Sequence, residues 1–157
     1  SYISQKNIDL VTKHGIYTET EFRARHEIHL EAYCKIVNIE ALTSVDMALH
    51  QILPAAMAYA KSLCEGAIVK KQMGIEPKTE IALVERLSAA TDAAYKLVRQ
   101  LKDSLNEIPA DTDDAVAYYN DVIVALMEQL RQQADILEEL TDKKYWPYPT
   151  YSDLLYY

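Results

Sequence analysis

Apolar residues recur at alternating intervals of three and four along two stretches of the chain, residues 84–108 and 116–140. Such a 3.5-residue repeat places one apolar stripe along each helix and is typical of helices packed side by side. The repeat therefore predicts an all-α fold. The stripe residues are Val84, Leu87, Thr91, Ala94, Val98, Leu101, Leu105 and Ile108 in the first stretch, and Val116, Tyr119, Ile123, Leu126, Leu130, Gln133, Leu137 and Leu140 in the second.

A helix-start signal precedes these stretches at residues 17–22. Thr18 is a candidate N-cap, and Glu21 follows three residues later, where its carboxylate can reach back in a capping box. Tyr17 and Phe22 occupy the two positions of a hydrophobic staple around the same cap. The signal predicts that a long helix begins at about residue 18.

Turn residues predict the other boundaries. Gly15 suits the left-handed turn after a short helix at 3–13, GIEPK at 74–78 is a breaker, and Pro109 with Asp111 stops and recaps the chain. The expected elements are a lead-in over 1–17, helices over about 18–42, 44–73, 79–108 and 111–141, and a tail over 143–157.

The stretch from 18 to 73 allows two interpretations. Thr43 and Asp46 repeat the capping spacing, so a second helix starts there or the first carries through with a bend. Pro54 deletes one backbone hydrogen bond and crowds the carbonyl four residues earlier, which predicts a kink near 50–54. One bent helix and two separate helices both stay open.

Helix and loop lengths predict the architecture. About 30 helical residues span about 45 Å, and loops this short make consecutive helices antiparallel. The expected fold class is all-α, an elongated antiparallel helical bundle with long, partly kinked helices and an extended aromatic and proline-rich C-terminal tail. Its core is three helices at 44–73, 79–108 and 111–141, and the helix at 18–42 projects from them or folds beside them. Residues 1–157 are expected to form a single domain.

Charge and cysteine content bear on partners and location. The net charge of -8 repels phosphate backbones and anionic lipids, which argues against nucleic-acid and membrane partners. No stretch approaches the roughly 18 apolar residues of a membrane span, and the first residues do not form a signal peptide. Cys34 and Cys64 are too few for a disulfide framework and predict free thiols. Together these features predict a cytoplasmic location.

The sequence contains no recognised motif for catalysis, phosphate binding or metal binding. Its three glycines form no phosphate-binding loop, and no G-x-S-x-G occurs. His26 and His29 stand near Cys34 without the zinc-protease spacing, and no histidine has a glutamate three residues before it, as a di-metal carboxylate site requires. The sequence therefore predicts no catalytic, cofactor-binding or metal-binding residue.

The C-terminal residues KKYWPYPTYSDLLYY are the one large apolar strip outside the helix stripes. Tyr and Trp are the residues that best anchor interfaces, and Pro147 and Pro149 restrict the backbone, so less entropy is lost on docking. The strip can pack on its own bundle, dock on another domain or subunit, or do both. The candidate docking residues are Tyr145, Trp146, Pro147, Tyr148, Pro149, Tyr151, Leu154 and Leu155.

Two segments resemble one known family. Residues 24–63, ARHEIHLEAYCKIVNIEALTSVDMALHQILPAAMAYAKSL, resemble the helical segment near the C-terminus of the type III glutamine synthetases, which shows a pattern close to R-Y-E-I-x-L-E-x-Y followed by I-x-I-E-A and I-x-P-A. Residues 146–155, WPYPTYSDLL, resemble their terminal W-P-x-P-x-Y-x-x-L-L. The departures are His26, where Tyr is usual, and the final Tyr156 and Tyr157.

The resemblance implies that the chain is the C-terminal helical domain of a longer enzyme. Such enzymes join ammonia to glutamate with ATP hydrolysis through a glutamyl phosphate, using Mg²⁺ or Mn²⁺ held in a catalytic domain, and they assemble as large rings. The implied partners are the catalytic domain of the same chain and neighbouring subunits of a homo-oligomer. None of the family's catalytic, nucleotide or metal residues falls on this sequence.

Two other interpretations stay open. A free-standing helical adaptor would bind an amphipathic partner helix in a groove of the bundle. A small metal-binding bundle would use His26, His29 and His50. The absence of an initiator Met favours a fragment over the adaptor.

Overall fold

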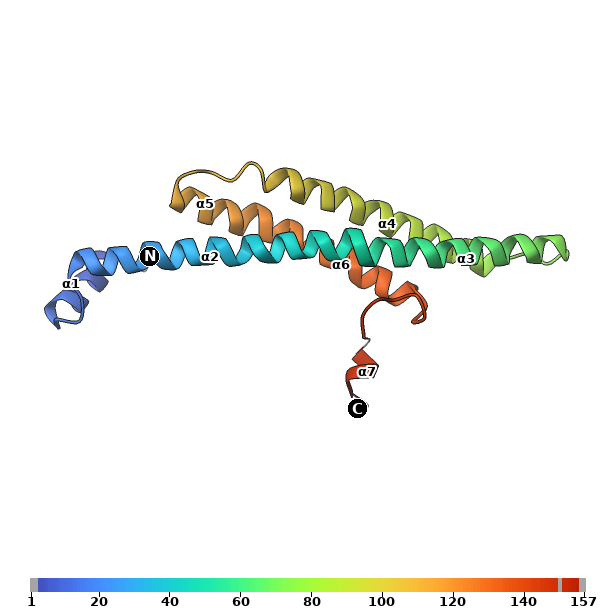
Figure 1. Ribbon diagram of the computed structural model, residues 1–157, viewed down its shortest axis with the longest axis horizontal. Helices are drawn as coiled ribbons and strands as arrows, with labels where there is room; N and C mark the ends of the chain where they lie inside the picture. The colour runs from blue at the N-terminus through green and yellow to red at the C-terminus, as the bar shows by residue number, and fades with distance from the viewer. Residues whose placement is uncertain (1–2, 150, 156–157) are drawn as a thin grey trace.

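The computed structural model describes residues 3–149 and 151–155, and these residues form an elongated set of long helices without a strand among them (Figure 1). The prediction of an all-α helical bundle is confirmed. The elements in chain order are α1 (Gln5–Lys13), α2 (Glu19–Met47), the π-helical turn η1 (Ala48–Ile52), α3 (Leu53–Gln72), α4 (Lys78–Ser104), α5 (Thr112–Tyr118), the π-helical turn η2 (Tyr119–Ile123), α6 (Val124–Leu140) and α7 (Tyr151–Leu155).

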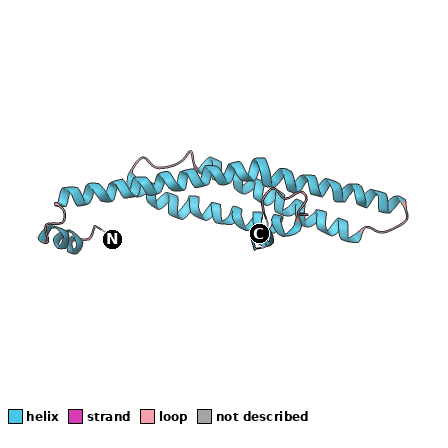
Figure 2. Ribbon diagram, turned by 60° about the horizontal axis from the view of Figure 1, so that its bottom comes forward, coloured by secondary structure: helices cyan, strands magenta, loops and turns pink. Residues whose placement is uncertain are grey.

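One unbroken helical rod made of α2, η1 and α3 runs the length of the molecule (Figures 1 and 2). It contains 54 residues, so at 1.5 Å per residue it is about 81 Å long. The predicted capping box begins it: the Glu21 N–H donates to the Thr18 hydroxyl at 3.2 Å, and the Thr18 N–H donates to the Glu21 carboxylate at 2.9 Å. These bonds hold the pKa of Glu21 below its usual value. The rings of Tyr17 and Phe22 stack at 6.5 Å, as the staple predicts.

The rod does not stop or restart at Thr43. The Thr43 and Ser44 hydroxyls each donate to the carbonyl four residues earlier at 2.8 Å, which is the hydrogen bonding of a helix interior. Where the kink was expected the rod continues in line, and residues 48–52 form the π-turn η1, in which the Leu53 N–H donates to the Ala48 carbonyl (Figure 1). The wider turn lies directly before Pro54 and gives room for its ring. Residues 18–73 are thus one helix rather than two.

The π-turn also keeps the core residues on one face of the rod. Val37 and Leu63 are 26 residues apart, so in an ideal α-helix their side chains would point in directions that differ by about 80° around the helix axis. A π-turn has more residues per turn and so a smaller rotation per residue, which reduces this angular difference. As a result Val37, Ala41 and Ala56 are all buried in one core.

A tight turn reverses the chain after α3. Gly74 has a φ of 77°, which favours glycine, while the Ile75 N–H donates to the Lys70 carbonyl at 2.9 Å. Lys70 also pairs with Glu80 in the first turn of α4, and this ion pair lowers the pKa of Glu80. Helix α4 therefore runs back antiparallel to α3, as the short breaker predicts.

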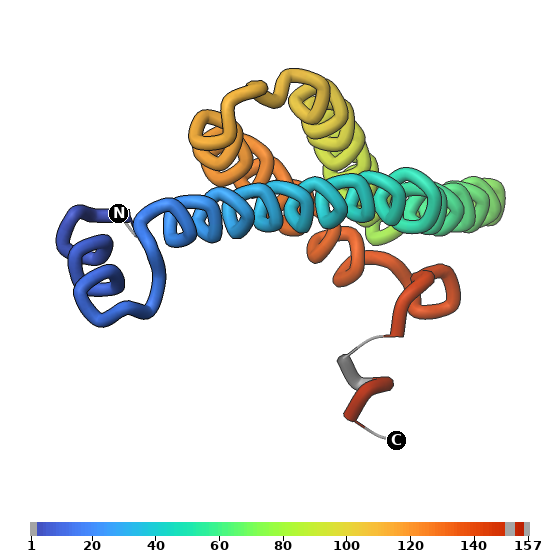
Figure 3. The backbone as a smooth tube through the Cα atoms, turned by 60° about the vertical axis from the view of Figure 1, so that its left-hand side comes forward, coloured from blue at the N-terminus to red at the C-terminus, as the bar shows by residue number. Residues whose placement is uncertain are grey.

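Helix α4 packs against α3 and α6, and α5 and α6 form the third long stretch (Figure 3). Asp111 caps α5 by accepting from the backbone N–H groups of Asp113 and Asp114, which confirms the predicted recap. The two predicted stripes face the core. Their buried members are Leu87, Ala94, Val98, Leu101, Tyr119, Ile123, Leu130, Leu137 and Leu140.

Helix α1 forms a small satellite at the start of the rod. It packs on α2, where Ile8 and Phe22 are buried. From there to Val37 the rod buries no residue, so the first turns of α2 project beyond the main core. The helix expected at 18–42 therefore projects with its first half and packs beside the bundle with its second half.

The extended form of the C-terminal tail is not confirmed. After α6 the chain turns, with the Tyr145 and Trp146 N–H groups both donating to the Asp142 carbonyl. The short helix α7 follows and lies away from the bundle (Figures 1 and 3). The spacing of Pro147 and Pro149 predicted one extended segment, but the turn at Asp142 directs the first part of the tail toward the core.

Candidate docking surfaces

The first half of the aromatic tail lies on its own bundle. Trp146 is 9% exposed and belongs to the main core. The ring of Tyr145 contacts that of Tyr59 on α3 at 5.4 Å, and Tyr148 meets Trp146 edge-on at 6.3 Å. Burial, with a smaller contribution from Asp46, raises the pKa of Tyr148. The tail is thus seated across the rod near η1 and α3.

The second half of the tail points outward. Pro147 and Pro149 are exposed, and Leu154 and Leu155 in α7 are 67% and 62% exposed. A Lys143–Asp153 ion pair connects α7 to the turn before it. Tyr151 begins α7, and its side chain lies outside the described set. Of the eight candidate docking residues, the structure thus turns the first aromatic ones inward and leaves the two leucines facing solvent.

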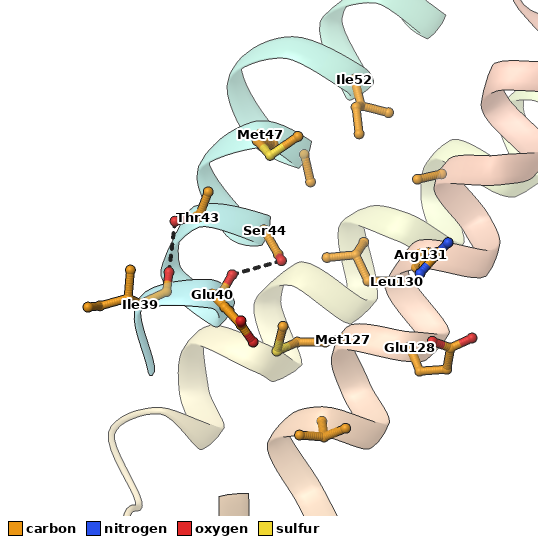
Figure 4. Close-up of a pocket in the computed structure, with 13 residues that line it drawn as sticks. Ile39, Glu40, Thr43, Ser44, Met47, Ile52, Met127, Glu128, Leu130 and Arg131 are labelled. Carbon is orange, nitrogen blue, oxygen red and sulfur yellow. Dashed lines mark hydrogen bonds between the residues drawn. The ribbon is translucent and has the colours of Figure 1, made fainter. Parts of the chain in front are cut away.

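A groove opens between α2–η1 and α6, with a volume of about 560 Å³ (Figure 4). Its floor is apolar and includes Ile52 from the rod and Leu130 from α6. Met47 and Met127 face it from opposite walls, and methionine side chains adapt readily to different partners. The rest of the lining is Ile39, Glu40, Thr43, Ser44, Ala48, Val124, Glu128, Arg131 and Ala134.

A ridge of large apolar side chains lies on the outer face of α2, and we call it the isoleucine ridge. Its four members are more than half exposed: Ile28 at 63%, Ile36 at 56%, Ile39 at 63% and Leu42 at 52%. Ile39 precedes the fully buried Ala41 by two residues, so the two lie about 200° apart around the helix. Helix α2 therefore carries large apolar residues on the side opposite its core as well as on the core side.

Because the ridge is exposed, its side chains do not contribute the folding free energy that their burial would provide. Burying an Ile or Leu side chain fully contributes about 1.5–3 kcal/mol. Ridge residues that are more than half exposed forgo roughly 1 kcal/mol or more each. Contiguous apolar surface of this kind marks an interaction site more often than a free surface. The ridge was not predicted, because its residues lie outside 84–108 and 116–140, the two stretches in which the 3.5-residue repeat was found.

Buried polar groups between the rod and α5–α6 are structural. The Tyr119 hydroxyl, at the start of η2, donates to the Asn38 side-chain oxygen on α2 at 3.3 Å. Burial raises the pKa of Tyr119, with a smaller contribution from Cys34, and burial also raises the pKa of Cys34. Raised pKa values keep both groups neutral, so neither is an activated nucleophile.

Within residues 3–149 and 151–155 no group of three or more His, Cys, Asp or Glu side chains is placed to hold a metal ion. His26 and His50 lie on one straight rod about 36 Å apart at 1.5 Å per residue, so they cannot share an ion. His50 instead lies 3.6 Å from Asp46, one turn earlier. The metal-binding alternative that joined His26, His29 and His50 is therefore wrong.

The rod also passes a test for membrane spans by length and composition alone. One 18-residue window has a mean hydropathy of 1.3, and 11% of that window is buried. The test is weak, because core helices of soluble proteins pass it too, and this rod packs against α4 and α6 along one face.

Known proteins match this chain closely enough to reveal its family. The model of the family described as the glutamine synthetase C-terminal domain matches residues 1–72. A glutamine synthetase from Butyrivibrio fibrisolvens is 33% identical over 159 residues, covering 99% of this chain and 23% of the relative. A type-3 glutamine synthetase from Dictyostelium discoideum is 29% identical, covering 98% of the chain and 22% of the relative.

A glutamine synthetase from Bacteroides fragilis is 30% identical over 150 residues, covering 90% of the chain and 20% of the relative. The chain thus spans between a fifth and a quarter of the length of these relatives. The resemblance expected from residues 24–63 and 146–155 is confirmed. The chain is a relative of the glutamine synthetases, type 3 among them, and carries the C-terminal domain of that family.

Proposed function

We propose that this chain is a non-catalytic helical domain at the C-terminus of a glutamine synthetase, and that it serves structure, domain docking and oligomer assembly. The parent reaction joins ammonia to glutamate with ATP hydrolysis. ATP and Mg²⁺ or Mn²⁺ would bind to another part of the parent chain, because no phosphate loop occurs in the sequence. The proposed location is cytoplasmic.

The observation that carries the proposal is the extent of the similarity. Nearly the whole chain aligns with glutamine synthetases, yet it accounts for only 23% of the first relative's length. A domain of this kind needs a stable core and outward apolar surface, and the chain has both. The buried stripes supply the core, while Leu154, Leu155 and the isoleucine ridge supply the surface.

The tail is proposed to attach in two ways. Trp146 anchors the chain on its own bundle, and Leu154 and Leu155 then project from a fixed position toward a catalytic domain or a neighbouring subunit. Anchoring one end reduces the entropy lost when the other end docks. The partners are therefore the catalytic domain of the same chain and other copies of the full-length protein.

Truncation of the full-length protein tests this role. Removal of residues 145–157 is expected to lower both glutamine formation and the native mass measured by light scattering. Replacing Leu154 and Leu155 by Ser separates outward docking from the Trp146 anchor. Met73→Ser is the matched control, since Met73 is 71% exposed in the distant α3–α4 turn. Unchanged activity and unchanged assembly after truncation would refute the docking role.

A free-standing adaptor is the second candidate, and the groove between α2 and α6 is the observation that favours it. The groove could receive the apolar face of a partner helix. The length of the native gene product decides between the two functions. A product of about this length supports the adaptor, while one of the relatives' length supports the synthetase domain.

A further inference from the structure

We infer that the isoleucine ridge, with the groove at its C-terminal end, is the surface on which the part of the full-length protein preceding this domain packs. This inference rests on the proposed function and makes it more specific. It assigns the main intramolecular contact to α2 rather than to the aromatic tail. It also names the occupant, which is the larger N-terminal part of the same polypeptide.

The first argument is the distribution of apolar residues around α2. Large apolar side chains on a second face of a helix gain stability when another surface covers them. Val37, Ala41 and Val45 occupy the core side of α2, while Ile36, Ile39 and Leu42 are exposed outside the core side. Among the described residues no element buries the ridge, so its four side chains stay more than half exposed and would gain stability from a covering surface.

The second argument is that ridge and groove are continuous. Ile39 belongs to both, because it is a ridge residue and also lines the groove. The groove walls include the π-turn η1 through Ala48 and Ile52, and α6 enters the groove directly after the π-turn η2. Such π-turns are frequent at functional sites, where they displace side chains from the regular helical register.

The third argument concerns charge. Lys35 lies among the ridge residues in sequence and pairs with Glu31 at 3.4 Å on the same helix. Arg23 pairs with Glu19 at 2.8 Å just before the ridge. The opposite charges within each pair neutralise each other, so neither pair adds a net charge beside the ridge. An apolar partner surface with a polar rim fits it.

The occupant follows from chain connectivity and net charge. In the proposed arrangement, the other three quarters or more of the protein enters through α1, which packs on the first turns of α2 at the same end of the rod as Ile28. A second copy of this domain carries the same net charge of -8, and like charge disfavours ridge-to-ridge pairing. The preceding part of the same chain is the nearest candidate, because it is covalently joined to α1 beside the start of the ridge.

Hydroxyl-radical footprinting of the full-length protein tests the inference without any substitution. For each ridge residue, the oxidation rate in the denatured protein is divided by the rate in the native protein. A ridge that is 52–63% exposed, as in this domain by itself, gives a ratio of about two or less, whereas a covered ridge gives about tenfold or more, as the fully buried Val98 does. A ratio for Ile36 and Ile39 that stays nearer to the open value overturns the inference.

Two further measurements on the same sample, the effect of dilution and the rate of glutamine formation, identify what covers the ridge. Protection that is lost on dilution, together with a fall in native mass, would mean that another copy covers the ridge, and this overturns the intramolecular occupant. Protection that persists on dilution supports it. Glutamine formation is measured in parallel: an active protein with an open ridge refutes this inference alone, whereas a protected ridge in a protein without synthetase activity refutes the proposed function alone.

Discussion

Trp146 provides a direct test of whether the tail belongs to the cooperative core. A Trp side chain buries about 150–250 Å² when it is covered, which corresponds to about 4–6 kcal/mol at 25 cal/mol per Å². At 9% exposure Trp146 realises nearly all of this burial. Core Trp→Ala substitutions cost about 3–5 kcal/mol. Because the tail can relax over the vacated space, we expect Trp146→Ala to lower the unfolding free energy by about 3 kcal/mol.

Urea unfolding of the 157-residue chain, followed by circular dichroism at 222 nm, measures this change. Tyr95→Ala is the matched control, because Tyr95 is an aromatic residue on the rod's neighbour α4 but is 51% exposed. We expect the control to cost less than about 1 kcal/mol. Trp146→Phe should recover part of the loss, since the smaller ring still fills much of the site.

The wild-type protein supplies an independent measurement, because Trp146 is its single tryptophan. If the tail unfolds with the core, Trp fluorescence and circular dichroism report the same transition. A fluorescence change at lower urea than the loss of helix, combined with a Trp146→Ala cost no larger than that of Tyr95→Ala, would show that the ring adds nothing to the core and refute the reasoning.

Three further predictions concern the rod and its turn. Pro54→Ala should change the unfolding free energy by no more than about 1 kcal/mol in urea titrations, because η1 already accommodates the ring; a loss of several kcal/mol would contradict this. At pH 8 a maleimide should modify exposed Cys64 before Cys34, whose pKa is raised by burial, and mass spectrometry after partial labelling shows the order. The pKa of Glu80 is lowered by Lys70, so its stabilisation is present above the usual carboxyl value of 4.5 and is lost as the pH falls below it. The stability difference between wild type and Glu80→Gln should therefore shrink below pH 4.5, and a difference independent of pH would exclude the ion pair as its cause.

The positions and packing faces of the main helices were predictable, because they depend on the spacing of apolar and capping residues. The stripes through Leu87 and Leu130 both face the core, and the caps at Thr18 and Asp111 form as their side chains require. The π-turns were not predictable, because no local residue pattern distinguishes one from an ordinary helical turn. At Thr43 the capping spacing was misleading, since packing of α2 against α5 and α6 keeps the helix continuous there.

The candidate surfaces were predictable only in part. The aromatic composition of the tail identified Trp146 and Leu155 correctly as unusual, but composition does not say which of them turns inward. That choice depends on the turn at Asp142 and on the space beside Tyr59, which are tertiary features. The isoleucine ridge had a signal in the sequence: Ile28, Ile36 and Ile39 are apolar residues beyond those that one core stripe needs.

A single continuous helix has a mechanical consequence for the molecule. The helix continues through η1 although Pro54 has no N–H to donate there, so the two halves of the rod are joined by helical backbone and not by a loop. Force applied at the α1 end is transmitted as a tilt of the whole beam, and the far tip beyond α3 sweeps through the largest arc. Whatever grips α2 thereby sets the orientation of the α3–α4 turn at the opposite end.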